Sequence, residues 1–183
     1  MKKQILSWYS QHKRDLPWRN TEDPYAILVS EVMLQQTQVD RVIPKYFSFL
    51  QRFPTIETLA RADCSEVIKE WSGLGYNRRA VYLHEFAKKI AKLGKWPTDP
   101  DDLAKLPGIG PYTSKSVLVF AYNANETLIE ANIRRIYLRL FLGNPESNPA
   151  KEIEELAIKN TPKGKSRDWH NALMDFGSEI CTA

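Results

Sequence analysis

The chain has 183 residues, of which 43% are hydrophobic and 26% are charged, and its net charge is +4. This composition is ordinary for a globular protein and excludes a disordered chain. No apolar run approaches the ~20 residues of a membrane helix, and the excess of basic residues favours a polyanionic partner. The only cysteines are Cys64 and Cys181. They exclude a disulfide framework and favour a reducing, cytoplasmic setting.

Proline and glycine divide the sequence into helical segments, and no segment alternates β-branched and polar residues. We therefore expect an all-α fold. The first strong helix is predicted at residues 24–38, with Asp23 as its cap and Pro24 in its first turn. Further helices are predicted at residues 40–52, 65–71, 78–93, 101–105, 111–122, 132–142, 149–159 and 168–180.

A short turn, LPGIG at residues 106–110, joins two of these helices. Gly108 and Gly110 lack a Cβ, so the backbone can turn sharply and approach another surface closely. The helix that begins at Pro111 starts with unpaired N–H groups and a partly positive end, which suits a phosphate oxygen. The alternative is a plain helix–helix turn, but here the apolar residues Leu106 and Ile109 flank the glycines.

The longer string LPGIGPYT at residues 106–113 resembles the helix-hairpin-helix element of base-excision DNA glycosylases. Other motifs resemble, in the same order, those of adenine DNA glycosylases, which remove adenine mispaired with guanine or 8-oxoguanine. These motifs are LPWR at 16–19, DPY at 23–25, SEVMLQQTQV at 30–39, GLGY at 73–76, EAN at 130–132 and NALMD at 171–175. The likeness covers essentially the whole chain, which is identified as a member of the helix-hairpin-helix (HhH-GPD) glycosylase superfamily.

The resemblance implies a two-lobed helical fold. One lobe, at residues 20–128, is expected to be a six-helix barrel that carries the hairpin. The second lobe is expected to combine residues 1–19 with residues 129–183, and the active site is expected in the cleft between the lobes. The implied partner is double-stranded DNA with a mismatched or damaged base. We expect a monomer that acts on the nucleoid in the cytoplasm and does not bind a membrane.

Two carboxylates carry the expected chemistry. Glu31 stands in an apolar helix beside Val32, where a charge is costly unless the carboxyl is protonated or its surroundings are polar. Cleavage of a purine N-glycosidic bond needs a proton donor for the leaving base and a carboxylate near the cationic sugar. The resemblance assigns the donor to Glu31, the second carboxylate to Glu130, and the positioning of water or carboxylates to Asn132. The alternatives are a Glu31 on a polar helix edge and a Glu130 that caps the next helix.

The chain departs from the family at two catalytic positions. Relatives usually carry Asp at position 130, so the extra methylene of Glu130 displaces the carboxylate. A misplacement of about 1 Å can cost roughly 100-fold in rate. Bifunctional relatives such as endonuclease III carry at position 112 a Lys that forms a Schiff base with the sugar. Tyr112 cannot do this, so we expect an enzyme without lyase activity, although Lys115 lies only three residues away.

The resemblance also assigns residues to reading the duplex. A glycosylase rotates its target base out of the stack, and a protein side chain must fill the gap. Gln35 and Gln36, at the end of the first long helix, match wedge residues, and Tyr76 is expected to stack beside the base opposite the lesion. The alternatives are a solvated helix end and a core aromatic residue. The remaining DNA contacts are expected from Leu106, Gly108, Ile109 and Gly110, and the base pocket from Trp18, Arg19, Leu34 and Asn171.

The sequence also suggests which residues contact phosphates and which cofactors the protein binds. The pairs Arg78–Arg79 and Arg134–Arg135 and the loop at residues 163–167 are candidates for neutralising phosphates. In relatives, Cys181 begins a four-cysteine iron–sulfur motif, but the chain ends two residues later and Cys64 matches no other ligand. We therefore expect no cluster, no other metal site, and no C-terminal domain that senses 8-oxoguanine. The resemblance admits a monovalent cation at the hairpin.

Two other functions stay open. A thymine or uracil mismatch glycosylase of the same superfamily shares Tyr112, and KSRDW at 165–169 with LMDF at 173–176 is closer to that branch. QQTQ at 35–38 and Gly75-Tyr76 favour the adenine branch. The other alternative is a DNA-binding module with weak or no catalysis, which Glu130 favours and Glu31 disfavours.

Overall fold

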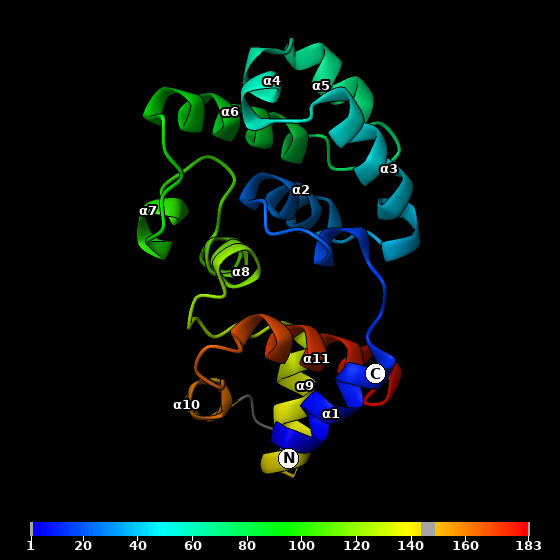
Figure 1. The fold of residues 1–183 in the computed structure, drawn as a ribbon, viewed down its shortest axis with the longest axis vertical. Helices are drawn as coiled ribbons and strands as arrows, with labels where there is room; N and C mark the ends of the chain where they lie inside the picture. The colour runs from blue at the N-terminus through cyan, green and yellow to red at the C-terminus, as the bar shows by residue number, and fades with distance from the viewer. Residues whose placement is uncertain (1, 144–148, 183) are drawn as a thin grey trace. The chain divides into compact units, whose positions relative to one another are not determined.

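The computed structural model describes residues 2–143 and 149–182. Within these ranges the chain forms eleven α-helices and one 3-10 helix, and no strand (Figure 1). The helices are α1 (Lys2–His12), η1 (Pro17–Arg19), α2 (Pro24–Leu34), α3 (Val39–Arg52), α4 (Ile56–Arg61), α5 (Cys64–Trp71), α6 (Arg78–Leu93), α7 (Pro100–Ala104), α8 (Pro111–Tyr122), α9 (Ala131–Phe141), α10 (Ala150–Asn160) and α11 (Ser166–Glu179).

The chain folds into two compact units, one formed by Leu16–Ala121 and the other by Met1–Asp15 together with Tyr122–Ala183. In the first unit α2 is apolar on nearly all sides, as expected of a helix enclosed by others, and it packs against α3 and α6. Asp23 caps α2 as predicted by accepting a hydrogen bond from the backbone N–H of Tyr25. An aromatic cluster of Phe49, Phe53 and Trp71 fills the core beside it.

In the second unit α11 packs against both α1 and α9, and α10 packs against α9. The core of this unit is built around Trp169 and Tyr137, which are almost fully buried. Asp175 on α11 is also fully buried, and its carboxylate accepts a hydrogen bond from Arg14 Nε at 2.6 Å. This ion pair attaches the segment after α1 to α11.

Most predicted helices are present, and the differences have local causes. The predictions at residues 78–93 and 111–122 match α6 and α8 at both ends. Helix α1 was not predicted, because its amphipathic pattern is weak and only Ile5 and Tyr9 are buried. Helix α4 is only six residues long and was also missed.

The predicted end of the first long helix was wrong. Helix α2 stops at Leu34 rather than continuing to Gln38. Gln35 has ψ 111°, outside the helical region, and Gln36 has a positive φ of 55°. The two glutamines therefore lie in a turn after the helix.

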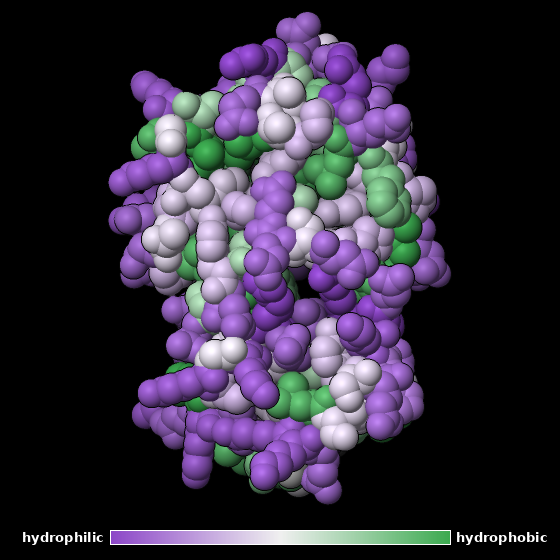
Figure 2. Space-filling model, viewed as in Figure 1, coloured by the Kyte–Doolittle hydropathy of each residue, from purple (hydrophilic) through white to green (hydrophobic). Residues whose placement is uncertain are grey.

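Polar side chains cover most of the visible surface, with apolar atoms in separate patches (Figure 2). Among the residues that the structure describes, no helix is long and apolar enough to cross a membrane.

Candidate nucleic-acid interface and active site

The turn that follows α2 exposes two of the predicted wedge residues. The side chains of Gln35 and Gln36 are exposed, whereas Val32 and Met33 in the last turn of α2 are buried. The backbone N–H of Thr37 donates to the carbonyl oxygen of Leu34 at 3.2 Å, which closes the turn. A buried helix end thus presents two polar side chains at the surface.

The loop between α5 and α6 presents the third predicted wedge residue. Tyr76 has a positive φ of 48° and is 67% exposed, whereas Leu74 in the same loop is buried. The indole N–H of Trp71 donates to the carbonyl oxygen of Gly75 at 3.2 Å. Leu74 and Trp71 therefore anchor the loop while Tyr76 lies at its surface, which is not the position of a core aromatic residue.

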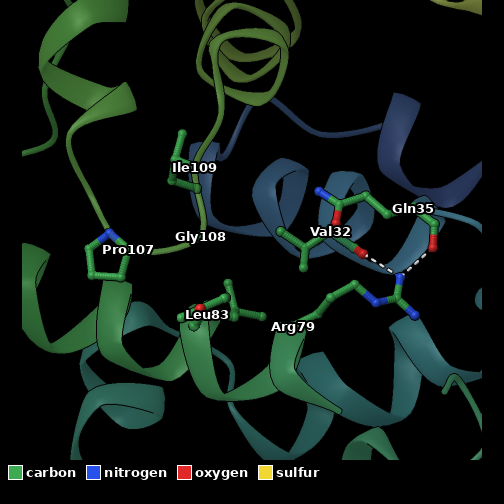
Figure 3. Close-up of a pocket in the computed structure, with 8 residues that line it drawn as sticks. Val32, Gln35, Arg79, Leu83, Pro107, Gly108 and Ile109 are labelled. Atoms are coloured by element: carbon green, nitrogen blue, oxygen red, sulfur yellow. Dashed lines mark hydrogen bonds between the residues drawn. The ribbon is translucent and has the colours of Figure 1, made fainter. Parts of the chain in front are cut away.

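Arg79, on the first turn of α6, directs its guanidinium toward the end of α2 (Figure 3). Its guanidinium donates hydrogen bonds to the carbonyl oxygens of Val32 at 2.8 Å and Gln35 at 2.6 Å. It also donates to the carbonyl oxygens of Leu74 and Gly75, each at 3.1 Å. Burial lowers the pKa of Arg79, an effect that the nearby Tyr76 opposes. The sequence grouped Arg79 with phosphate-neutralising residues, but its donors are directed at the protein's own backbone.

The two segments and the hairpin border one cavity of about 860 Å³. Its lining consists of Gln35, Gln36, Tyr76, Asn77, Arg78, Arg79, Tyr82 and Gly108. The structure thus brings the three predicted wedge residues together with one glycine of the hairpin. A cavity with exposed amide, aromatic and guanidinium groups suits a nucleic acid, whose bases stack on aromatic rings and whose phosphates attract Arg.

The hairpin contacts α6 through Gly108. A Cβ on Gly108 would lie 2.6 Å from the Cβ of Tyr82, and its φ of 73° is in the left-handed region, so only glycine fits here. Ile109 is buried, and its N–H donates to the carbonyl oxygen of Leu106 at 3.2 Å. Leu106 also borders a different cavity of about 460 Å³, beside Trp96.

The residues predicted for the catalytic acid and the base pocket lie on both units. Glu31 on α2 is half-buried, between the buried Ser30 and Val32. Trp18 on η1 is 8% exposed and packs edge-on against Tyr46 with ring centres 5.6 Å apart. Arg19 and Leu34 are half-buried in this unit, and Asn171 is buried in α11 of the other unit. Tyr112, the second residue of α8, is 37% exposed.

Glu130 is the N-cap of α9, as one of the two sequence interpretations expected. Its Oε1 accepts a hydrogen bond from the backbone N–H of Ile133 at 2.9 Å. Asn132 follows in the first turn, and its Oδ1 accepts from Arg135 Nη2 at 2.7 Å. The same Nη2 donates to the carbonyl oxygen of Gly177 at 2.6 Å. Both Glu130 and Asn132 are therefore fixed by hydrogen bonds within their own unit.

Sequence analysis missed the structural role of Arg135 and Gly177. Arg135 Nε donates to the carbonyl oxygen of Cys181 at 2.6 Å, so its donors join α9 to the end of α11. A Cβ on Gly177 would lie 2.6 Å from the Cβ of Asn132. No sequence signal distinguishes Arg135 from a surface Arg, because two of its three partners, Gly177 and Cys181, lie more than 40 residues away.

A buried histidine supports the segment that leads to Glu130. His170 Nε2 accepts a hydrogen bond from the backbone N–H of Leu128 at 2.9 Å, and its Nδ1–H donates to the carbonyl oxygen of Ser166 at 2.8 Å. Burial lowers the pKa of His170 to about 4, against a smaller opposing effect of the bond to Ser166. The ring is therefore neutral near pH 7, and its two hydrogen bonds give it a structural role.

The hairpin and the cysteines decide which metal groups this chain could hold. The hairpin at residues 106–110 has no acidic side chain and offers main-chain carbonyl oxygens, which are hard donors that suit a monovalent cation. The only two cysteines of this sequence, Cys64 at the start of α5 and Cys181 after α11, do not themselves supply the four thiolates of an iron–sulfur cluster. Within residues 2–143 and 149–182, no three His, Cys, Asp or Glu side chains gather into a metal site.

Comparison with known proteins identifies related sequences. The family model described as "HhH-GPD superfamily base excision DNA repair protein" matches residues 29–163. An adenine DNA glycosylase of Mycolicibacterium smegmatis is 40% identical over 184 residues, covering 98% of this chain and 63% of the relative. The adenine DNA glycosylase of Homo sapiens is 37% identical, covering 97% of this chain and 35% of the relative. The chain thus spans about one to two thirds of the length of these curated relatives.

A solved structure resembles the fold over nearly the whole chain. The structure of a thermostable thymine-DNA glycosylase superposes with a TM-score of 0.91 at 33% identity, covering 99% of this chain and 86% of the other. Sequence similarity thus points to adenine glycosylases, and this structural similarity includes a thymine glycosylase.

Proposed function

Because the chain belongs to the HhH-GPD superfamily of base excision DNA repair proteins, we propose that it is a monofunctional DNA glycosylase. Its substrate is adenine mispaired with guanine or 8-oxoguanine in double-stranded DNA, and it works as a monomer on nucleoid DNA in the cytoplasm. The observation that carries the proposal is the similarity to adenine DNA glycosylases over 98% of the chain. The exposed wedge residues beside the hairpin support it.

In the proposed reaction Glu31 protonates a ring nitrogen of the leaving adenine. The bond between that base and C1′ of the sugar breaks with its electron pair going to the base, and an oxocarbenium-like sugar remains. Water then adds to C1′ and loses a proton, which leaves an abasic site. The half-buried position of Glu31 on an apolar helix supports its role as an acid.

The second carboxylate in this proposal is Glu130, which stabilises the cationic sugar. Its Oε1 is engaged by the backbone N–H of Ile133, which fixes the direction of the side chain and leaves Oε2 for the sugar. Asn132 orients the water or the carboxylates, since its Oδ1 is held by Arg135 and its amide nitrogen belongs to the same rigid group.

We assign the reading of the duplex to the cavity at the end of α2. Gln36 enters the space left by the extruded base, and Tyr76 stacks beside the opposite base. The hairpin binds the DNA backbone through main-chain groups of Gly108 and Gly110. Its carbonyl oxygens would hold a monovalent cation, which supplies positive charge next to a phosphate.

The alternative is a thymine or uracil mismatch glycosylase. It is favoured by the structural similarity to a thymine-DNA glycosylase at 33% identity over 99% of the chain. The two functions predict cleavage of different bases in otherwise identical duplexes.

The deciding experiment uses labelled duplexes that contain A·G, A·8-oxoguanine, T·G or U·G, followed by alkali, which cleaves the strand at abasic sites. We expect cleavage at adenine, and none with Glu31→Gln. Cleavage at T or U alone would replace the proposal by the mismatch-thymine alternative. Binding without cleavage of any duplex would indicate a DNA-binding module.

A further inference from the structure

We propose that Arg79 is a positioning residue that joins the turn after α2 and the loop before α6 into one rigid platform for reading DNA. The inference rests on the function proposed above and deepens it. It concerns a side chain that does not reach DNA itself but sets the spacing between Gln36 and Tyr76.

The two terminal nitrogens of the Arg79 guanidinium bond to different segments. Nη1 donates only to the α2 side, to the carbonyl oxygens of Val32, Met33 and Gln35 at 2.6–3.1 Å. Nη2 donates to the carbonyl oxygens of Leu74 and Gly75 at 3.1 Å and reaches back to Thr37 Oγ1 at 3.3 Å. Because the guanidinium is planar and rigid, it fixes the distance between the two groups of acceptors.

The acceptors explain why a cation is needed at this place. Val32 and Met33 belong to the last turn of α2, where carbonyl oxygens have no intrahelical donor and the helix dipole is negative. The guanidinium supplies both the donors and the positive charge that this helix end needs. It also lies over the rings of Trp71 and Tyr76, at 5.4 and 5.7 Å from their centres.

The neighbouring Arg78 differs from Arg79 in its exposure. It is exposed, and it lies over the ring of Tyr82 at 5.1 Å from the ring centre. Arg78 therefore has the accessibility that a phosphate contact requires, whereas Nη1 and Nη2 of Arg79 already donate inside the protein. The basic pair in the sequence separates into one residue that can face DNA and one that holds the platform.

The first test uses the free wild-type protein and needs no DNA. The backbone N–H of Thr37 bonds to Leu34 and that of Leu74 bonds to Trp71, so both amides are protected from hydrogen exchange. If Arg79 joins the two segments, the amides of Thr37 and Leu74 open with the same free energy and the same urea dependence. Distinct opening free energies for the two amides would overturn the proposal.

The second test compares Arg79→Lys and Arg79→Gln with wild type. Lys keeps the charge, but its three N–H donors lie on one nitrogen and do not span the two groups of acceptors as Nη1 and Nη2 of Arg79 do. We expect at least tenfold faster exchange in both residues 33–38 and residues 72–77 for each variant. We also expect at least tenfold weaker binding to a duplex with a non-cleavable adenine analogue opposite 8-oxoguanine, with affinity for a fully paired duplex within twofold of wild type. The matched control is Arg61→Lys, an exposed Arg on α4, which should change neither quantity.

The salt dependence of DNA binding separates positioning from phosphate contact. Removing one phosphate contact lowers the slope of log K against log salt by about one. Arg79→Gln should keep the wild-type slope, whereas Arg78→Gln should lower it. A slope lowered by about one in Arg79→Gln, with unchanged exchange, would overturn the proposal. If the wild-type protein excises no adenine while the exchange results hold, the proposed function fails and the platform stands.

Discussion

Gly177 and Asn132 are in van der Waals contact across α11 and α9, so close that a Cβ on Gly177 would lie 2.6 Å from the Cβ of Asn132. The Gly177→Ala variant must therefore move Asn132 or α9. Overpacking of this kind costs about 1–3 kcal/mol. We also expect the single-turnover excision rate to fall roughly 10- to 100-fold, because a displacement of about 1 Å at a reacting group costs about 100-fold. Urea unfolding and single-turnover kinetics measure the two effects.

The control for this variant is Ser178→Ala, at the adjacent exposed position, whose hydroxyl donates only to the carbonyl oxygen of Asp175. It should leave the excision rate unchanged. A Gly177→Ala protein with wild-type rate and stability would mean that α9 and α11 adjust without moving Asn132.

Glu130 combines a capping role with a proposed electrostatic role, and two substitutions separate them. Glu130→Gln keeps a carbonyl oxygen that can accept the N–H of Ile133 but removes the charge. We expect the excision rate to fall at least 100-fold while the free energy of unfolding changes little. Glu130→Ala removes both functions and should also lose about 1 kcal/mol of stability, the usual value of an N-cap. Equal rates for wild type and Glu130→Gln would exclude Glu130 as the second carboxylate.

Tyr112 predicts an enzyme that does not form a covalent adduct with the sugar. Borohydride added during excision should trap no protein–DNA complex with the wild type. Lys115 is one turn further along α8 and is the alternative nucleophile, so Lys115→Ala is the matching control. An adduct that forms with wild type and disappears with Lys115→Ala would assign lyase activity to that lysine.

The sequence predicted the helices whose boundaries depend on local chemistry. Asp23 and Pro24 define the start of α2. Helix α6 ends at Leu93, and Gly94, whose φ is positive, caps it. A signal for α4 was also present, because Thr55 and Thr58 form a capping box. These features depend on neighbours within four residues and can be read directly from the chain.

The remaining features depend on contacts between distant residues. The early end of α2 is stabilised by Arg79, which lies more than 40 residues away from its acceptors there. The candidate site residues stay a prediction from the resemblance to a family, and the residues that hold them in place, such as Arg79 and Arg135, were not among them. Arg79 and Arg135 stand in basic pairs that were candidates for neutralising phosphates, because nothing in the local sequence distinguishes a half-buried guanidinium that bonds within the protein from an exposed one.

His170 makes the stability of the protein depend on pH. Its pKa is about 4 in the folded protein, against an ordinary value of 6.5. Below about pH 6.5 the unfolded chain binds a proton that the folded chain excludes, so stability is lost as the pH falls from about 6.5 to about 4. The maximum effect is about 3 kcal/mol, at about 1.4 kcal/mol for each pH unit.

The variant His170→Gln should be less stable than wild type at pH 7, because the bonds to Leu128 and Ser166 are disturbed. Its disadvantage should shrink by about 2 kcal/mol or more between pH 7 and pH 4.5, since only the wild type must exclude a proton there. Urea unfolding of both proteins at each pH measures the difference, in which the effects of the shared carboxylates cancel. A difference that stays constant over this range would mean that His170 does not set the acid sensitivity of the unit that carries Glu130.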